Sequence, residues 1–415
     1  MVLRPGSEEQ AAAVFRKWEL EFAVIGTITG NGNLTLLRHG QVVADMPVAA
    51  LVDNVPEYDR PAEIRRAPES HRPIAESTDP MADLMTLLGT PDLCSKRWIW
   101  EQYDHMVMAD TVQRPGGDAA VVRIHDSDRG LAIATDCTPR YCAADPVEGG
   151  RQAVAEVWRN LTATGARPLA ITDCMNFGNP ERPEIMGQFA GAIEGMAEAC
   201  RGLDFPVVSG NVSFYNETNG QAVLPTPAIG GIGLLDAIGR MATLALKGPG
   251  NALLLIGETK GHLCRSLYQR HIAGHAEGRP PPVDLGAERR AGDFVRPLIA
   301  EGAVLACHDI SDGGLLVAVA EMAMAGDIGA HIDSDTAAPT GFLFGEDQGR
   351  YIIEIGEAAA GGLLEGAEKA GIVARRLGTT GGDGLTVDAF RTISLGKLRQ
   401  IHEDWLPAYM AGAAG

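Results

Sequence analysis

The sequence lacks long hydrophobic runs, paired cysteines and any excess of basic residues. Its longest apolar runs, residues 252–256 and 315–320, fall far short of the ~20 residues that cross a bilayer, so no membrane partner is predicted. Acidic residues outnumber basic ones by 54 to 35, and the net charge of −19 excludes nucleic acid as the main partner. The seven cysteines form no CxxC pair, which predicts a reduced, cytoplasmic protein without zinc. We also expect no signal peptide before the first predicted helix.

Several nucleotide and hydrolase motifs are also missing. There is no GxxxxGK[ST] loop, no GxGxxG after a strand and no serine elbow, which excludes the Walker, dinucleotide-binding and serine-hydrolase templates. What the chain has in abundance is glycine, 51 of 415 residues, without a fixed-period repeat. This composition indicates many tight turns, or backbone segments that approach a ligand closely.

The first 60 residues predict a small and incomplete region. Capping-box spacing at Ser7–Gln10 predicts a helix over residues 8–18, and strand-like segments follow at 22–29, 34–38 and 41–46. So small a set makes a poor independent domain, and we interpret it as the end of a domain whose beginning is absent. Residues 55–80 lose the apolar period and predict an extended linker.

The remainder predicts an α+β fold rather than a doubly wound sheet, because its strands and helices do not alternate strictly. Helices are indicated by apolar stripes and strands by short apolar runs. The predicted strands lie at 119–124, 130–135, 169–172, 252–256, 304–307 and 351–355, and the predicted helices cover 153–161, 185–200 and 315–324.

The first candidate site follows the strand at 169–172. Asp173 stands at the predicted strand end, before an amide-rich loop with Gly and Pro, where a carboxylate meets a metal-bound phosphate or a ribose. An ordinary Asx-turn is the alternative interpretation.

The second candidate site is a Gly-rich turn predicted after Val207 and Val208. Gly210 permits close backbone approach, Asn211 offers an oxygen ligand suited to Mg²⁺, and Ser213 can hydrogen-bond a phosphate or a polar substrate. The alternative is a polar loop capped by its own side chains.

The third candidate joins a strand to a helix at residues 307–314. The acids Asp309 and Asp312 suit a cation, and the following glycines free N–H groups for phosphate at the helix start. A helix cap by Ser311 or Asp312 is the compatible alternative. The pairing of His308 with Asp309 indicates no catalytic triad, because no nucleophile motif accompanies it.

Two further segments are less specific. Glu346 and Gln348 follow Gly345 before a strand and suit a ligand site or a solvated turn equally. Cations and aromatic residues gather at 95–104, a pattern typical of an interface or surface helix.

Together the motifs resemble the second half of phosphoribosylformylglycinamidine synthases, over about residues 11–400. The matching stretches occur in one order along the chain, which makes the resemblance specific. They are SKRWIWEQYDHMV, PGGDAAVVRI, DPVEGGRQAVAEVWRNL, ITDCMNFGNPE, VVSGNVSFYNET, PTPAIGGIG, CHDISDGGLLVAVAEMA and FGEDQGRYIIE.

The resemblance implies domains of the aminoimidazole ribonucleotide synthetase type, duplicated in the family as two pairs with pseudo-twofold symmetry. It divides this chain into one domain pair preceded by a partial domain. The implied parts are a remnant (1–62), a linker (63–93), an amino-terminal-type domain with ATP and Mg²⁺ motifs (94–240), a carboxy-terminal-type domain (241–400) and a tail (401–415).

The same resemblance implies an activity and its residues. The family joins formylglycinamide ribonucleotide to glutamine-derived ammonia at the expense of ATP. Asp173 and Gly210 match ATP contacts, Asn211 a magnesium ligand and Ser213 a substrate contact. The implied partners are a glutaminase subunit, a small accessory subunit and the missing amino-terminal half, without which we expect no turnover.

An auxiliary nucleotide site is implied at His308, Asp309 and Asp312. One departure bears on it, because Cys264 and Arg265 stand where the family usually has Gly-Gln. A side chain there crowds a backbone-to-phosphate approach, unless Arg265 supplies the charge itself. Two other functions stay open: a non-catalytic nucleotide-binding or scaffolding unit, and another ATP-dependent synthetase of the superfamily.

Overall fold

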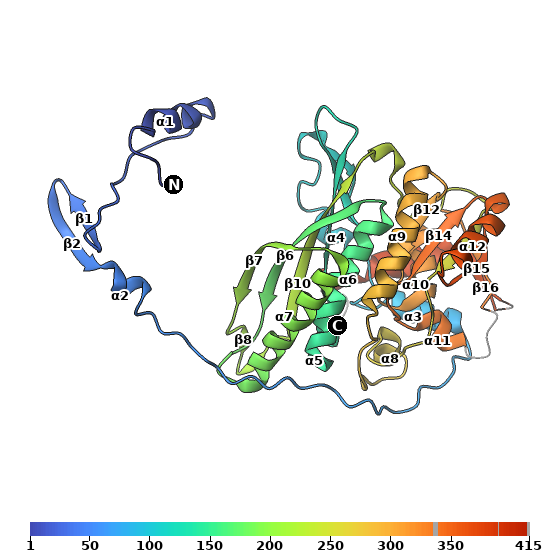
Figure 1. The fold of residues 1–415 in the computed structure, drawn as a ribbon. Coiled ribbons are helices and arrows are strands. Elements are labelled where there is room, and N and C mark those ends of the chain that lie inside the picture. Colours follow the sequence, from blue (N-terminus) through green and yellow to red (C-terminus); the bar gives the residue numbers. More distant parts are fainter. Residues whose placement is uncertain (335–338, 389, 413–415) are drawn as a thin grey trace. The chain divides into compact units, whose positions relative to one another are not determined.

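The computed structural model describes residues 1–334, 339–388 and 390–412, and they fall into two units (Figure 1). The first unit is Met1–Asp59 and the second begins at Arg60, and each is described by itself. Within these ranges, none of the helices combines the length and the hydrophobicity that a membrane span requires.

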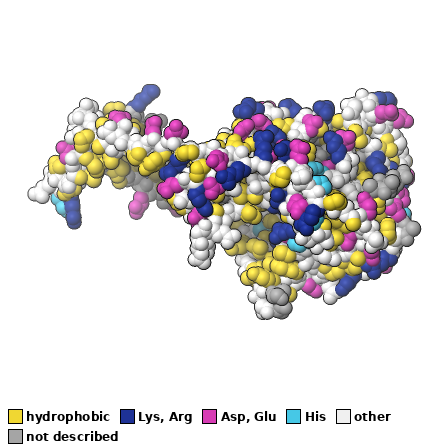
Figure 2. Space-filling model, turned by 90° about the horizontal axis from the view of Figure 1, so that it is seen from below, with side chains coloured by type: hydrophobic (Ala, Val, Ile, Leu, Met, Phe, Trp, Pro, Cys, Tyr) yellow, Lys and Arg dark blue, Asp and Glu magenta, His cyan; other side chains and the backbone are white. Residues whose placement is uncertain are grey.

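The first unit is small and buries little. Its β-hairpin turns at His39 and Gly40, both with positive φ, as a two-residue hairpin turn requires. Ala12 is the only described hydrophobic residue that this unit buries, and Figure 2 shows hydrophobic side chains along its surface, at the left of the view. Its elements are α1 (Glu8–Lys17), β1 (Asn33–Arg38), β2 (Gln41–Pro47) and α2 (Val48–Val52).

Two predictions for this unit were wrong in part. The segment 22–29 forms no strand, and Ile25 is 99% exposed, because no neighbouring segment pairs with it. The helix at 8–18 and the strands at 34–38 and 41–46 are confirmed, but the Ser7 side chain makes no capping hydrogen bond.

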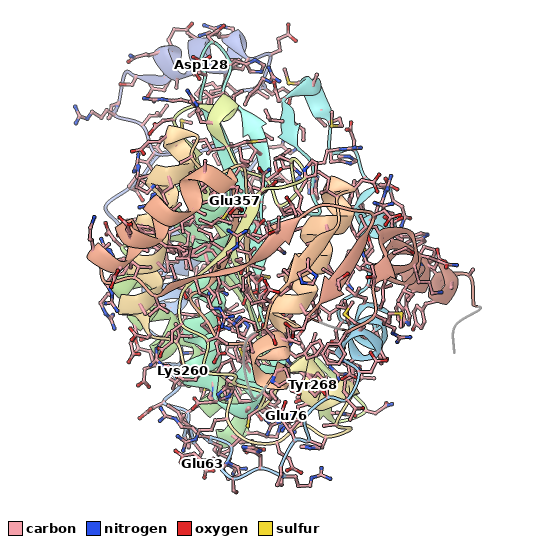
Figure 3. All side chains as sticks on the ribbon, turned by 90° about the vertical axis from the view of Figure 1, so that its right-hand side faces the viewer. Glu63, Glu76, Asp128, Lys260, Tyr268 and Glu357 are labelled. Atoms are coloured by element: carbon pink, nitrogen blue, oxygen red, sulfur yellow. The ribbon has the colours of Figure 1, made fainter. Side chains whose placement is uncertain are left out.

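The second unit begins with an extended strap, residues 60–79, that contains no helix or strand. The strap is docked rather than free: Glu63 N–H donates to Pro183 O at 2.8 Å, and Ser77 N–H donates to Thr340 Oγ1 at 2.7 Å. Figure 3 shows Glu63 and Glu76 on the same side of the molecule. The predicted linker 63–93 also includes a core helix, α3 (Pro80–Leu88), which buries Met81, Leu84, Leu87 and Leu88 completely.

A six-stranded sheet forms the first domain of this unit. All neighbours in it are antiparallel except the parallel pair β6–β7, and β7 lies at its edge. Three helices cover one face: α5 (Pro139–Ala144), α6 (Pro146–Ala163) and α7 (Pro183–Leu203). In sheet order the strands are β3 (Thr111–Gln113), β4 (Ala120–Arg123), β5 (Gly130–Asp136), β10 (Thr226–Leu235), β6 (Arg167–Asn176) and β7 (Val207–Ser213).

A seven-stranded sheet forms the second domain and lies between two helical layers. Leu253 and Leu255 of its central strand pack on one side, against α3 and α10, while Leu254 and Ile256 pack on the other, against α9. The strands in order are β12 (Ala306–Asp309), β14 (Tyr351–Ile355), β11 (Ala252–Ile256), β15 (Ala374–Thr380), β13 (Ala330–Ile332), β16 (Gly384–Val387) and β17 (Ile393–Ser394). The helices are α8 (Leu267–His271), α9 (Leu285–Glu301), α10 (Gly314–Gly326), α11 (Pro339–Phe344), α12 (Ala360–Lys369) and α13 (Leu395–Met410).

The predicted α+β class is therefore confirmed, since helices and mixed sheets form a domain pair. The segment 95–104 contains only the short helix α4 (Arg97–Trp100), with no buried residue. The loop at residues 274–282 has neither helix nor strand.

Candidate functional site

The first two candidate sites lie side by side on β6 and β7. The parallel register sets Asp173 opposite Gly210, Cys174 opposite Asn211, and Asn176 opposite Ser213. Neither motif is the turn that the sequence predicts. Strand β6 continues past Asp173 to Asn176, and β7 runs through Gly210 and Asn211, because the parallel pairing of the two strands extends as far as Asn176 opposite Ser213.

Successive side chains of a strand point to opposite faces of the sheet, so the candidate residues Asp173, Gly210, Asn211 and Ser213 do not all share one face. Asp173 shares its face with Ile171 and Met175, which pack against the helices. Asn211 and Ser213 therefore point to the opposite, open face of the sheet. The four residues are adjacent along the backbone, but their side chains do not converge on one point.

Asp173 explains why position 210 is glycine. A Cβ built on Gly210 would lie 2.5 Å from Asp173 Oδ1, far inside contact distance. Partial burial raises the pKa of Asp173, and a hydrogen bond from the Asn211 backbone N–H opposes that rise. The carboxylate and the edge strand thus hold each other in place.

Two polar side chains that were not site candidates, Asn216 and Cys174, contact the candidate residues on the open face of the sheet. Asn216 Nδ2 donates to Ser213 Oγ at 3.1 Å and to the Phe177 carbonyl at 3.0 Å, which fixes the Ser213 hydroxyl. Cys174 Sγ lies 3.8 Å from Asn211 Oδ1. Their spacing in the motif was visible in the sequence, but their roles depend on the strand register.

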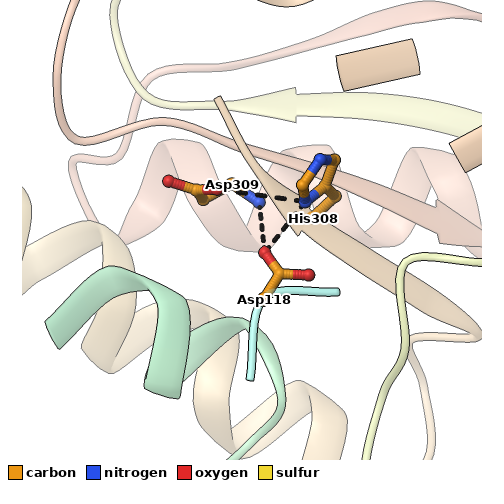
Figure 4. Close-up of side chains that lie close together, drawn as sticks. All are labelled: Asp118, His308 and Asp309. Atoms are coloured by element: carbon orange, nitrogen blue, oxygen red, sulfur yellow. Dashed lines mark hydrogen bonds and ion pairs between the residues drawn. The ribbon is translucent and has the colours of Figure 1, made fainter. Parts of the chain in front are cut away.

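The third candidate site holds His308 between two carboxylates. Its Nδ1 lies 2.9 Å from Asp118 Oδ1, a contact that Figure 4 shows, and its Nε2 lies 3.2 Å from Glu321 Oε2. Burial by itself would lower the pKa of His308, yet Asp118 and Glu321 raise it well above its usual value. Ligand atoms of Asp118, His308 and Asp309 lie within 4.8 Å of one another, as a metal site requires. Both ring nitrogens of His308 are thus paired with carboxylates, and these pairs hold the cluster together within the chain.

The other two residues of that site bind arginines of the six-stranded domain. Asp309 Oδ2 accepts from Arg159 Nε at 2.9 Å, and Asp312 Oδ2 accepts from Arg140 Nη1 at 2.8 Å. Arg159 is fully buried and also contacts Glu288 at 3.0 Å. His308 and Asp309 end strand β12 and Asp312 follows three residues later, but each side chain binds a different partner.

A carboxyl pair lies beside these arginines. Asp136 and Glu156 share a hydrogen bond, and burial, with the charges of Asp312 and Asp309, raises the pKa of Asp136 to about 7. Burial also raises the pKa of Glu156 well above its usual value. Neither residue was a sequence candidate, because twenty positions separate them and no motif marks them.

The fold and these contacts define a protein of the aminoimidazole ribonucleotide (AIR) synthase class, and the chain belongs to that family. The model of the AIR synthase related protein N-terminal domain matches residues 116–235, and the C-terminal domain model matches residues 248–389. These matches coincide with the six-stranded and seven-stranded domains.

Within that family, the similarity is to one particular protein, the phosphoribosylformylglycinamidine synthase subunit PurL. The chain is 58% identical to PurL of Rhodospirillum rubrum over 418 residues, which cover 99% of this chain and 56% of that protein. It is 57% identical to PurL of Parvibaculum lavamentivorans, over 100% of this chain and 57% of that protein. The resemblance drawn from the motifs is confirmed. The chain spans little more than half the length of these curated relatives.

Solved structures share the fold. Thermotoga maritima PurL complexed with FGAR covers 77% of this chain and 53% of its own, with a TM-score of 0.64 and 19% identity. The same protein complexed with AMPPCP covers 92% of this chain and 55% of its own, with a TM-score of 0.57 and 22% identity.

Proposed function

We propose that this chain provides one domain pair of a phosphoribosylformylglycinamidine synthase, the ATP-dependent ligase of purine biosynthesis. The pairing of β6 with β7 supports this most, because it joins the two motifs that resemble the family's ATP, magnesium and substrate contacts. Relatives named as this synthase subunit match the chain over its whole length, and a PurL structure is titled as complexed with FGAR.

In the proposed reaction, the amide oxygen of formylglycinamide ribonucleotide attacks the γ-phosphate of ATP, and ammonia then displaces phosphate from the iminophosphate. Mg²⁺, when bound, neutralises charge on the phosphoryl oxygens. Asn211 Oδ1 would be one ligand, and phosphate oxygens, water and residues outside this chain would complete its six. The Ser213 hydroxyl, oriented by Asn216, would bind the substrate, while Asp173 and Gly210 would contact the nucleotide.

The arrangement supports only one wall of an active site. Among the described residues, no helical layer covers the face that carries Asn211 and Ser213, and this face exposes Ile133 and Ile232. We infer that an amino-terminal half supplies the second wall, that a glutaminase subunit and a small accessory subunit complete the cytoplasmic complex, and that this chain alone does not turn over.

Calorimetry with Mg²⁺ and ATP tests the nucleotide site. Asp173→Ala and Asn211→Ala should each weaken binding at least about tenfold, a loss of ~1.4 kcal/mol. Asn54→Ala, in the first unit, is the matched control and should bind as the unchanged chain does. Equal affinity in all four proteins would favour the alternative, a scaffolding unit with a separate nucleotide site.

Activity measurements test the rest. Release of ADP that depends on formylglycinamide ribonucleotide and ammonia should be absent with this chain, and should appear after addition of the amino-terminal part of Rhodospirillum rubrum PurL. Turnover by this chain alone would contradict the one-wall proposal. Turnover with a different amide or carboxylate substrate would identify another synthetase of the superfamily.

A further inference from the structure

The carboxylates of Glu346 and Asp347 lie where several backbone N–H groups converge, as they do in sites that bind an anion. Glu346 and Asp347 lie between α11 and β14, where the loop 257–266 and the turn before α10 meet. Backbone N–H groups from that loop and that turn point at their carboxylates. Such converging N–H groups are the usual features of a phosphate site.

Every acceptor position of Glu346 is filled. Its Oε1 accepts from Leu267 N–H and Gly313 N–H, both at 2.8 Å. Its Oε2 accepts from Arg140 Nη2 at 2.7 Å and from the Tyr141 hydroxyl. A carboxylate offers about four lone-pair sites, and here four donors use them on a side chain that is 0% exposed. Burial raises the pKa of Glu346 while Arg140 opposes it, and an all-donor surrounding fits the ionised form.

Asp347 binds a second group of N–H donors. Its Oδ2 accepts from Lys260 N–H at 3.2 Å and Gly261 N–H at 2.8 Å, and its Oδ1 accepts from His262 N–H at 3.3 Å. Asp347 is 7% exposed, at the rim of a cavity of about 180 Å³. Three successive backbone N–H groups thus form an anion-binding concavity, and the carboxylate of Asp347 occupies it.

Two glycines of this region serve close packing of the chain. A Cβ on Gly314 would lie 2.6 Å from the Phe344 carbonyl carbon, and one on Gly345 would lie 2.4 Å from Gly341 O. The N–H of Gly314 donates to Ser311 O. The predicted use of Gly313 and Gly314 for a phosphate is therefore replaced by contacts within the chain.

Three nearby arginines are also engaged by groups within the chain. Arg159 binds Asp309, and Arg350 donates to the backbone oxygens of Gly345 and Asp347. Arg265 adopts a positive φ of 62°, and its Nε donates to Gly278 O at 2.9 Å. Arg265 thus binds the surface loop instead of supplying charge to a phosphate.

We propose that Glu346 and Asp347 are built-in anionic ligands of this backbone site, and that they exclude a nucleotide phosphate from it. The auxiliary nucleotide implied by the family resemblance does not fit residues whose donors are already used. The inference does not depend on the proposed function, because it concerns other elements than β6 and β7.

Rescue by a small carboxylate tests the site. Glu346→Ala should lower the unfolding temperature by several degrees, and 100 mM sodium formate should restore at least half of the loss, whereas sodium chloride should not. Glu346→Gln is the matched control: its amide fills the same space, so formate should shift it no more than the unchanged chain. Equal formate shifts in the two variants would overturn the proposal. If Glu346→Ala does not fold, Asp347→Ala and Asp347→Asn at the rim give the same comparison.

Nucleotide titration tests the exclusion separately. In an Asp173→Ala/Asn211→Ala variant, which lacks the contacts proposed on β6 and β7, we expect no heat of MgADP binding. Saturable one-to-one binding that Asp312→Asn then removes would overturn the proposal. Failure of this arm leaves the proposed ligase function intact, because that function is tested at Asp173 and Asn211 in the otherwise unchanged chain.

Discussion

At the scale of single residues, the sequence motifs pointed to Asp173 and Gly210 as parts of one site, but they did not show why residue 210 is glycine. Gly210 and Asp173 were candidates for one ligand, and the structure sets them opposite each other in adjacent strands. The Asp173 carboxylate lies where a Cβ of residue 210 would stand, so a larger residue there would have to displace it. No property of either motif alone shows this, because it arises from the register between them.

Substituting Gly210 tests that contact. Gly210→Ala should lower the free energy of unfolding by about 1–3 kcal/mol, since its Cβ would displace the Asp173 carboxylate or the edge strand. Urea unfolding measures the change. Gly366→Ala in α12 is the control, because its Cβ meets open space and alanine favours helix. If the Gly210→Ala chain is as stable as the unchanged one, strand β7 or the Asp173 carboxylate moves aside without a cost, and the prediction is wrong.

The carboxyl pair gives a prediction for pH. The pKa of Asp136 is about 7 in the folded chain against ~3.9 in an unfolded one, so folding takes up a proton between about pH 4 and 7. Stability from this group therefore falls as pH rises through that window, by at most about 1.4 kcal/mol per pH unit, and is constant above it.

Asp136→Asn removes this titration. Its stability relative to the unchanged chain should increase from pH 5 to pH 8 in thermal unfolding. Asp128→Asn, at an exposed aspartate (Figure 3), should show no such trend. A pH-independent difference for Asp136→Asn would contradict the raised pKa.

At the scale of elements, apolar periodicity was reliable where a segment packs against another. It located α6, α7 and α10 and the buried strands β11 and β14. It failed at residues 22–29, where apolar side chains have no partner strand, and at β6 and β7, whose polar ends resemble turns. Backbone pairing, which fixes strand ends, leaves little trace in side-chain hydrophobicity.

The excess of glycine also has a cause at this scale. Two helices of the six-stranded domain, α6 and α7, approach so closely that a Cβ on Gly195 would lie 1.8 Å from Val147 O, and one on Gly150 would lie 2.3 Å from Ala192 O. Sequence reasoning assigned extra glycine to turns and ligands. Gly150, Gly191 and Gly195 instead permit contact between these two helices.

Because α6 and α7 lie so close together, adding one methyl group between them should lower the stability of the fold substantially. Gly195→Ala should cost about 3 kcal/mol, because a backbone oxygen cannot move aside as a flexible side chain can. Gly396→Ala in α13, where nothing lies within 4 Å of the built Cβ, should be neutral or slightly stabilising. Thermal unfolding of both variants at one pH makes the comparison, and equal midpoints would refute the close approach.

At the scale of the whole second unit, buried charges join the two domains. Arg140 and Arg159 extend from α5 and α6 to carboxylates of the seven-stranded domain, at Asp312, Glu346, Asp309 and Glu288. The partners in these pairs are 129 to 206 residues apart in the sequence, so no local sequence pattern predicts them. The sequence contained no readable sign of how the two domains are joined.

Removing one of these arginines should therefore affect both domains. Arg159→Ala leaves Asp309 and Glu288 buried without their main cation, which typically costs about 3–5 kcal/mol. Because the lost contacts bridge the domains, amide hydrogen exchange should accelerate in both α6 and β12, and calorimetry should show one transition at a lower temperature. Arg289→Ala, at an exposed ion pair with Asp293, should change stability by less than about 0.5 kcal/mol. Exchange that accelerates in β12 alone, with α6 unchanged, would mean that Arg159 stabilises only its acidic neighbours and that the two domains unfold independently.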